Sequence, residues 1–228
     1  MSEGKLTKQE LREDPVVTAM MQIGTSAKKR LPYLLAAVAL VVAVFVVLQV
    51  MQRSKASGER AAAVLVLEGE NQYQNGNLSE ALSKFQQAAD RYGGSRSGKL
   101  ATMRTGDIQM ELGNVAEAKA RYEKFLRASP EGGLLRSSAL RGLAGALESS
   151  GQKEEAAKRF LEAADVPDSP LQFDDLLSAG NAYLDAGKLD DAEKAFQRAI
   201  AEHPSHPRAR DAREGLETVR AMRGGGGR

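Results

Sequence analysis

The chain has 228 residues, a formal net charge of +2 and no cysteine. The lack of cysteine excludes disulfides, thiolate metal sites and cysteine nucleophiles. The near balance of charges argues against the extended basic surface that nucleic-acid binding requires, so we expect no nucleic-acid partner.

Residues 1–30 form a polar tail in which we expect a short amphipathic helix. Thr7 and Glu10 have the spacing of a helix capping box, and Asp14 stands before Pro15, which suits a first helical position. An apolar stripe at helical spacing follows: Val16, Val17, Met20, Met21 and Ile23. The stripe would lie on a membrane surface or dock a partner, and a poorly ordered tail is the equal alternative.

Residues 31–51 are predicted to form a transmembrane helix. They read LPYLLAAVALVVAVFVVLQVM, without a single Asp, Glu, Lys or Arg. At ~1.5 Å rise per residue, a helix of this length covers about 31 Å, close to the ~30 Å hydrocarbon core of a bilayer. A cleaved signal peptide and a buried core helix are the alternatives. Thirty residues precede the run and no small-residue cleavage site follows it, which favours an uncleaved anchor.

Basic residues flank both ends of this segment, so the charge rule gives no clear orientation. The cluster at 28–30 precedes it, and Arg53, Lys55 and Arg60 follow within about 15 residues. The tail adds further basic residues, and long C-terminal domains are translocated largely regardless of charge. We therefore expect a cytoplasmic N-terminus and an extracytoplasmic C-terminal domain, and the opposite orientation remains the alternative.

The rest of the chain contains four similar segments. In each, a glycine is followed five residues later by alanine and nine residues later by an aromatic residue: Gly76/Ala81/Phe85, Gly113/Ala118/Tyr122, Gly151/Ala156/Phe160 and Gly187/Ala192/Phe196. The glycines are 37, 38 and 36 residues apart. A repeat of this period predicts stacked two-helix units, none of which buries its apolar face alone.

The expected organisation is therefore all-α. We predict a linker at 52–59, four helix pairs over 60–206, a polar capping helix at 207–223 and a flexible glycine-rich tail at 224–228. The eight helices of the pairs are expected at about 60–75, 78–92, 98–112, 115–128, 135–150, 153–165, 172–186 and 189–202.

The fourth segment resembles the tetratricopeptide repeat family. Its matching residues are Leu176, Ala179, Gly180, Tyr183, Gly187, Ala192, Phe196, Ala199 and Pro204. The resemblance implies an α-solenoid whose first helices line a peptide-binding groove. Its groove positions fall on Val66, Glu70, Tyr73, Met103, Asp107, Met110, Arg141, Glu148, Leu177, Asn181 and Leu184. This mixture of apolar residues and carboxylates would suit apolar segments with basic neighbours.

Three patterns come close to a chemical site, and we predict no catalytic, cofactor or metal site from them. The loop Gly93 to Lys99 fits the start of a phosphate-binding P-loop, but Leu100 stands where Mg²⁺ ligation needs Ser or Thr. His203 and His206 lack the further ligands that a structural zinc needs. Acidic pairs at 174–175 and 190–191 lie near predicted helix starts, where carboxylates are favoured without a catalytic role.

The layout of tail, single span and repeat domain resembles the single-span ancillary subunit of the bacterial Sec translocon. That resemblance implies a non-catalytic scaffold in the bacterial inner (plasma) membrane, which binds proteins such as a membrane complex, a chaperone or an exported client. One alternative is an adaptor that faces the cytoplasm and recruits soluble partners. The second is a nucleotide-binding switch at residues 93–99. The sequence gives no oligomeric state.

Overall fold

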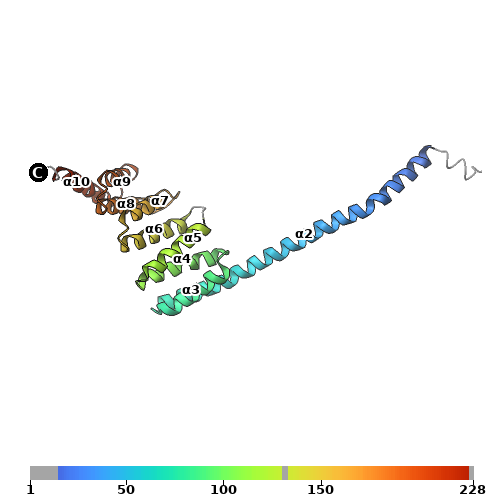
Figure 1. The fold of residues 1–228 in the computed structure, drawn as a ribbon, viewed down its shortest axis with the longest axis horizontal. Coiled ribbons are helices and arrows are strands. Elements are labelled where there is room, and N and C mark those ends of the chain that lie inside the picture. Colours follow the sequence, from blue (N-terminus) through green and yellow to red (C-terminus); the bar gives the residue numbers. More distant parts are fainter. Residues whose placement is uncertain (1–14, 130–132, 226–228) are drawn as a thin grey trace, which may run out of the picture. The chain divides into compact units, whose positions relative to one another are not determined.

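The computed structural model describes residues 15–129 and 133–225 (Figure 1). Within these ranges the protein forms nine α-helices, α2 to α10, and no strand, which confirms the all-α prediction. The chain divides into two compact units, Met1–Ala56 and Ser57–Arg228. We describe each unit separately.

The described part of the first unit is a single helix. Helix α2 (Pro15–Gln74) begins there and continues into the second unit. All described side chains between residues 33 and 51 are exposed, among them Phe45 and Leu48 at 60% and 52%. The part of α2 from Leu35 onward contains a window of mean hydropathy 2.5, none of it buried. By length and composition, this helix is able to cross a membrane.

The structure bears on two expectations for the first part of the chain, the helix in the tail at 1–30 and the linker at 52–59. The capping-box pair Thr7 and Glu10 lies outside the described residues, whereas residues 15–30 are helical. Residues 52–59, expected as a linker, are also helical and belong to α2. Their sequence, QRSKASGE, contains no proline and one glycine, so nothing in it stops a helix that has already begun.

The second unit contains antiparallel helix pairs stacked in chain order (Figure 1). The last turns of α2 pair with α3, and each later helix packs on its neighbours in the chain. The helices that follow α2 are α3 (Leu78–Tyr92), α4 (Arg96–Glu111), α5 (Val115–Ala128), α6 (Leu134–Ser149), α7 (Lys153–Ala164), α8 (Gln172–Asp185), α9 (Leu189–Glu202) and α10 (Ala209–Gly225).

A glycine in the left-handed region ends the first helix of each pair. Gly76, Gly113, Gly151 and Gly187 have φ between 72° and 78°. At Gly113 the N–H donates to the Met110 carbonyl at 3.0 Å, and the next N–H donates to Gln109 at 2.8 Å. These bonds satisfy carbonyls that the helix end leaves free, as the glycine pattern predicted.

Aromatic side chains of the second helices fill the core against glycines of the first helices. A Cβ at Gly106 would lie 2.8 Å from the Tyr122 ring, and one at Gly69 would lie 2.9 Å from the Phe85 ring. Both rings are at most 2% exposed. The close approach of helix backbones therefore depends on these glycines.

Helix α10 closes the stack by packing on α9 and α8. Its apolar stripe includes Ala212 and Val219, which are fully buried. Glycines 224 and 225 extend α10 instead of starting the flexible tail, and residues 226–228 lie outside the described chain.

Candidate protein-binding surface

All eleven predicted groove positions lie on first helices of the pairs, namely α2, α4, α6 and α8. Their exposures differ. Met103 and Leu177 are 7% and 2% exposed and belong to the hydrophobic core, while Met110 and Leu184 are half-buried against it. Packing of first helix against second helix thus occupies part of the predicted lining.

Arg104 on α4, which the sequence analysis did not single out, joins two of the predicted positions. Its Nε donates to Glu70 at 2.6 Å and its second terminal nitrogen donates to the other Glu70 oxygen at 2.9 Å. The same guanidinium lies 3.4 Å from Asp107 and 6.0 Å from the centre of the Tyr73 ring. Two parallel hydrogen bonds to one carboxylate fix the orientation of α2 against α4.

Asp107 also accepts a hydrogen bond from the second helix of its own pair. The Tyr122 hydroxyl donates to Asp107 at 2.8 Å. Burial raises the pKa of Asp107, and burial together with this carboxylate raises the pKa of Tyr122. The carboxylates of Glu70 and Asp107 are therefore engaged within the protein and hold helices together.

Arg141 on α6 meets a buried carboxylate on α8. Its Nε lies 3.7 Å from one oxygen of Asp175, whose side chain is 1% exposed. The other Asp175 oxygen has no hydrogen-bond partner among the described residues. Burial raises the pKa of Asp175 to about 7, against the opposing effect of Arg141. The sequence placed Arg141 in the groove, and its partner Asp175 was predicted only as a helix-start residue.

Glu148 and Asn181 form the open polar part of the predicted groove. Both are exposed, and neither side chain makes a hydrogen bond or ion pair within the described chain. Burial and then the charge of Asp185 raise the pKa of Glu148, while Lys153, 3.0 Å from Asp185, opposes the rise. A carboxylate in this environment is stabilised by a cation from outside.

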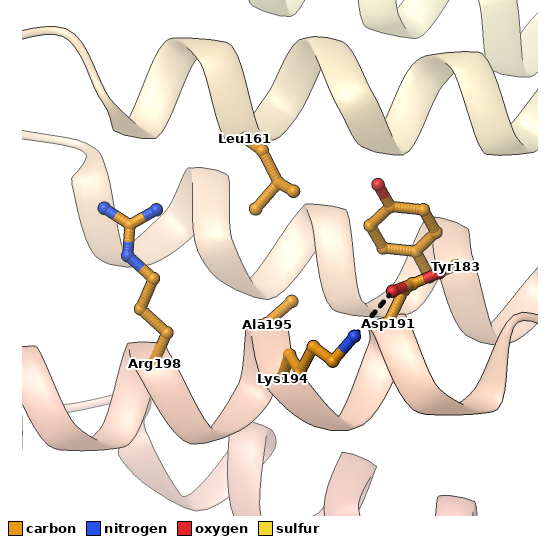
Figure 2. A pocket seen from close by; sticks show the side chains of 6 residues that line it. All are labelled: Leu161, Tyr183, Asp191, Lys194, Ala195 and Arg198. Atoms are coloured by element: carbon orange, nitrogen blue, oxygen red, sulfur yellow. Dashed lines mark hydrogen bonds and ion pairs between the residues drawn. The ribbon is translucent and has the colours of Figure 1, made fainter.

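A small pocket is lined by three helices of the last two pairs, α7, α8 and α9. Figure 2 shows Leu161 of α7, Tyr183 of α8 and four residues of α9 around it. Its volume is about 150 Å³. Small-molecule sites typically measure about 300–1,000 Å³, so this pocket has room for a single side chain. Its rim is internally paired, with Lys194 at 3.2 Å from Asp191 and Arg198 at 2.7 Å from Asp165. The repeat pattern gave no signal for it beyond Tyr183.

The loop that resembled a P-loop is occupied by the chain's own carboxylate. Glu59 accepts hydrogen bonds from the Ser97 backbone at 3.2 Å and from the Ser97 hydroxyl at 2.6 Å, at the start of α4. These hydrogen bonds lower the pKa of Glu59. Ser95 caps the same helix by accepting from the Gly98 N–H at 3.0 Å. The donors that would hold a phosphate are therefore in use, which argues against nucleotide binding.

The two histidines have structural contacts. His203 lies 3.0 Å from the Gln172 side-chain oxygen, and the His206 ring stacks on Phe173 at a centroid distance of 3.9 Å. No group of three or more metal-binding side chains gathers among the described residues. Within that part of the chain, these contacts account for both imidazoles.

The comparison with family models identifies the repeats. The model described as "Tetratricopeptide repeat-like domain" matches residues 29–215. The chain belongs to this family. Because the match begins at residue 29, it includes the apolar segment as well as the repeats. A comparison with curated proteins gives no match.

Solved structures of tetratricopeptide repeat proteins share the fold. A tetratricopeptide repeat protein from Parabacteroides merdae has 19% identity and a TM-score of 0.60 over 72% of this chain and 61% of its own. YrrB, described as having an unusual peptide-binding site, has 18% identity and a TM-score of 0.57 over 75% of this chain and 82% of its own. PilF of Pseudomonas aeruginosa has 19% identity and a TM-score of 0.56 over 72% of each chain. At these identities the likeness establishes the fold alone.

Proposed function

We propose that this protein is a non-catalytic, membrane-anchored scaffold that binds other proteins through the first helices of its repeats. One observation carries the proposal: the apolar segment of α2, whose described side chains between residues 33 and 51 are uncovered, is followed by a tetratricopeptide-like domain. An exposed apolar surface of this extent needs lipid or protein around it. The repeat fold supports a role in protein–protein interaction.

We further propose that the N-terminus is cytoplasmic and the repeat domain extracytoplasmic, in a bacterial inner membrane. In this setting the protein would act as an ancillary subunit that holds a chaperone or exported client beside a membrane complex such as the translocon. The Lys and Arg residues of the tail at 1–30 support this orientation, because cytoplasmic flanks of a span carry an excess of basic residues. The competing proposal is the same scaffold facing the cytoplasm.

Labelling a single cysteine separates the two orientations. Gly94 is exposed and a Cβ there would meet no atom within 4 Å, so Gly94→Cys leaves the fold intact. The chain has no other cysteine. Labelling of intact cells by a membrane-impermeant thiol reagent, with any outer membrane permeabilised, is the expected result. Protection until lysis would establish the cytoplasmic adaptor instead.

The open carboxylate of Glu148, beside Asp185, favours a partner segment with basic residues next to apolar ones. Apolar contacts would come from Met110 and Leu184, which are only half-buried. YrrB, a repeat protein of the same fold with an unusual peptide-binding site, supports an extended peptide as the bound form. Basic side chains would offset the burial and the charge of Asp185, which together raise the pKa of Glu148.

Photocrosslinking from position 181 tests this surface. A photoreactive residue at Asn181 should capture a membrane-complex subunit, chaperone or exported client in native membranes, and Glu148→Lys should reduce the yield several-fold. Glu123→Lys is the matched control, because Glu123 lies on second helix α5 and pairs with Arg127. Equal yields from both charge reversals would contradict the proposed surface.

A further inference from the structure

Helix α2 presents an uncovered apolar face within the repeat unit. Val64 and Leu67 are 56% and 62% exposed. Their neighbours Leu65 and Val66 pack on the first core cluster, and Gly69 lies against the Phe85 ring of α3. At about 100° per residue, Val64 and Leu67 point away from that packed side.

The same positions are covered in the later repeats. The glycine spacing of the repeats aligns residue 64 with residues 101, 139 and 175. Ala101 and Ala139 are fully buried and Asp175 is 1% exposed. The position that aligns with Leu67 in the third repeat is Gly142, where a Cβ would run into the Tyr122 ring of the preceding pair. In later repeats, this face therefore packs against the repeat before it.

The residues on this face of α2 suit another helix. Val64, Leu67 and Asn71 follow one another at intervals of three and four residues, the spacing of a, d and a in a heptad. Parallel two-stranded coiled coils favour a β-branched residue at a and leucine at d, and one asparagine at a fixes register and pairing. Asn71 is exposed and its side chain makes no hydrogen bond within the described chain.

We propose that a second copy of this chain packs on this face, with the two α2 helices parallel and Val64, Leu67 and Asn71 each meeting their own counterpart. The inference rests on the proposed membrane anchor. Two copies in one membrane share a topology, so their α2 helices leave the bilayer in the same chain direction. A common membrane also raises the effective concentration of one copy around the other.

The charge of Arg60 limits where the contact between the two α2 helices can begin. Arg60 precedes Val64 by four residues and would face its own counterpart in a parallel pair. Like charges at facing positions oppose association, so the contact begins at Val64. The paired stretch is then about two helical turns, and its stability depends on the confinement of both chains to one membrane.

Cysteine crosslinking of the full chain in its native membrane tests the pairing, because the protein has no cysteine of its own. Under mild oxidation, Val64→Cys should give a disulfide-linked dimer in most of the molecules. Leu134→Cys is the matched control, since Leu134 is 61% exposed at the start of α6, and it should remain monomeric. In the Val64→Cys background, Leu67→Glu should reduce the dimer at least tenfold, whereas Leu134→Glu should leave it unchanged.

Equal crosslinking at positions 64 and 134 would overturn the proposal. So would a photoreactive residue at position 64 that captures a different protein instead of a second copy. Fractionation of the same cells keeps the two claims apart. A chain that is embedded in the membrane but not linked at position 64 contradicts the pairing alone, whereas a chain in the soluble fraction contradicts the anchor whatever its crosslinks.

Discussion

At the scale of single residues, Asp175 stands out among the described side chains as a buried carboxylate with an unpartnered oxygen. A nearly fully buried carboxylate with one unpartnered oxygen opposes folding whenever it is charged. Because burial raises its pKa to about 7 from an ordinary value of 3.8, the folded state holds a proton that the unfolded state releases. The resulting stabilisation is complete below about pH 4 and is lost as the pH rises through 7.

The variant Asp175→Asn should remove this pH dependence. At pH 8.5 we expect it to unfold at a temperature several degrees above that of the unchanged protein, because the rise of the pKa from 3.8 to about 7 corresponds to a gain of up to ~4 kcal/mol. At pH 3, where the carboxyl is protonated in both the folded and the unfolded state, the two melting temperatures should agree closely. Asp174→Asn is the control, because the neighbouring Asp174 is paired with Arg208 at 2.7 Å and partly exposed. A melting temperature for Asp175→Asn below that of the unchanged protein at pH 8.5 would show that the Arg141 contact outweighs desolvation.

The bond between Arg104 and Glu70 should stabilise the first two repeats. In a double-mutant cycle with Arg104→Met and Glu70→Gln, we expect a coupling free energy of about 1–2 kcal/mol. The pair is only partly buried, with side-chain exposures of 35% and 25%, which keeps the value below that of a fully buried pair. Urea unfolding measures it. A coupling close to zero would mean that the bidentate geometry contributes nothing to stability.

The sequence predicted which helices carry the residues of the candidate surface, but not all of the contacts that these residues make. The repeat pattern assigned every groove position to a first helix, because the glycine and aromatic positions fix the helix register. It could not show that Arg104 reaches Glu70, a residue 34 positions earlier, since that bond depends on how neighbouring repeats stack. It also treated Met103 and Leu177 as lining, and their burial follows from the packing of α5 and α9 on these helices.

At the scale of elements, the turn glycines decide where the first helices end. At Gly113, φ is +78° and no neighbouring atom would obstruct a Cβ, so the cost of a side chain there is a backbone cost. We expect Gly113→Ala to reduce the free energy of unfolding by about 1–2 kcal/mol. Gly94→Ala is the matched control, because that exposed glycine has no left-handed φ and an equally open Cβ site. Thermal unfolding of both variants makes the comparison, and equal melting temperatures would contradict this explanation.

The sequence could predict that the repeats consist of helices, because the repeat period and the spacing of apolar residues are typical of helix pairs. Predicted helices such as 78–92 and 115–128 coincide with α3 and α5. Residues 52–59 were expected as a linker because they are polar and lie between two apolar segments. Composition alone does not break a helix, however, and without proline the polar stretch remains part of α2.

At the scale of the whole molecule, the protein consists of two units that differ in how far their apolar side chains are buried. The repeat unit buries its own core and ends in a capping helix, α10, as a stable stack requires. The described side chains of the apolar segment in the first unit are exposed to whatever surrounds them. The proposed function combines a segment whose length and composition suit a bilayer with a repeat fold that supports protein–protein interaction.

The most direct test of this account is the fractionation of cells that express the full chain, compared with a Val44→Arg/Val47→Arg variant. Each arginine near the centre of a span costs about 2.5–3.5 kcal/mol of insertion free energy, so two of them should prevent insertion. Val44→Leu/Val47→Leu preserves the apolar character and serves as the control. We predict that the unchanged chain and the leucine variant stay with the membrane after alkaline extraction while the arginine variant is released. Release of the unchanged chain into the soluble fraction, at full length or shortened at its N-terminus, would contradict the account.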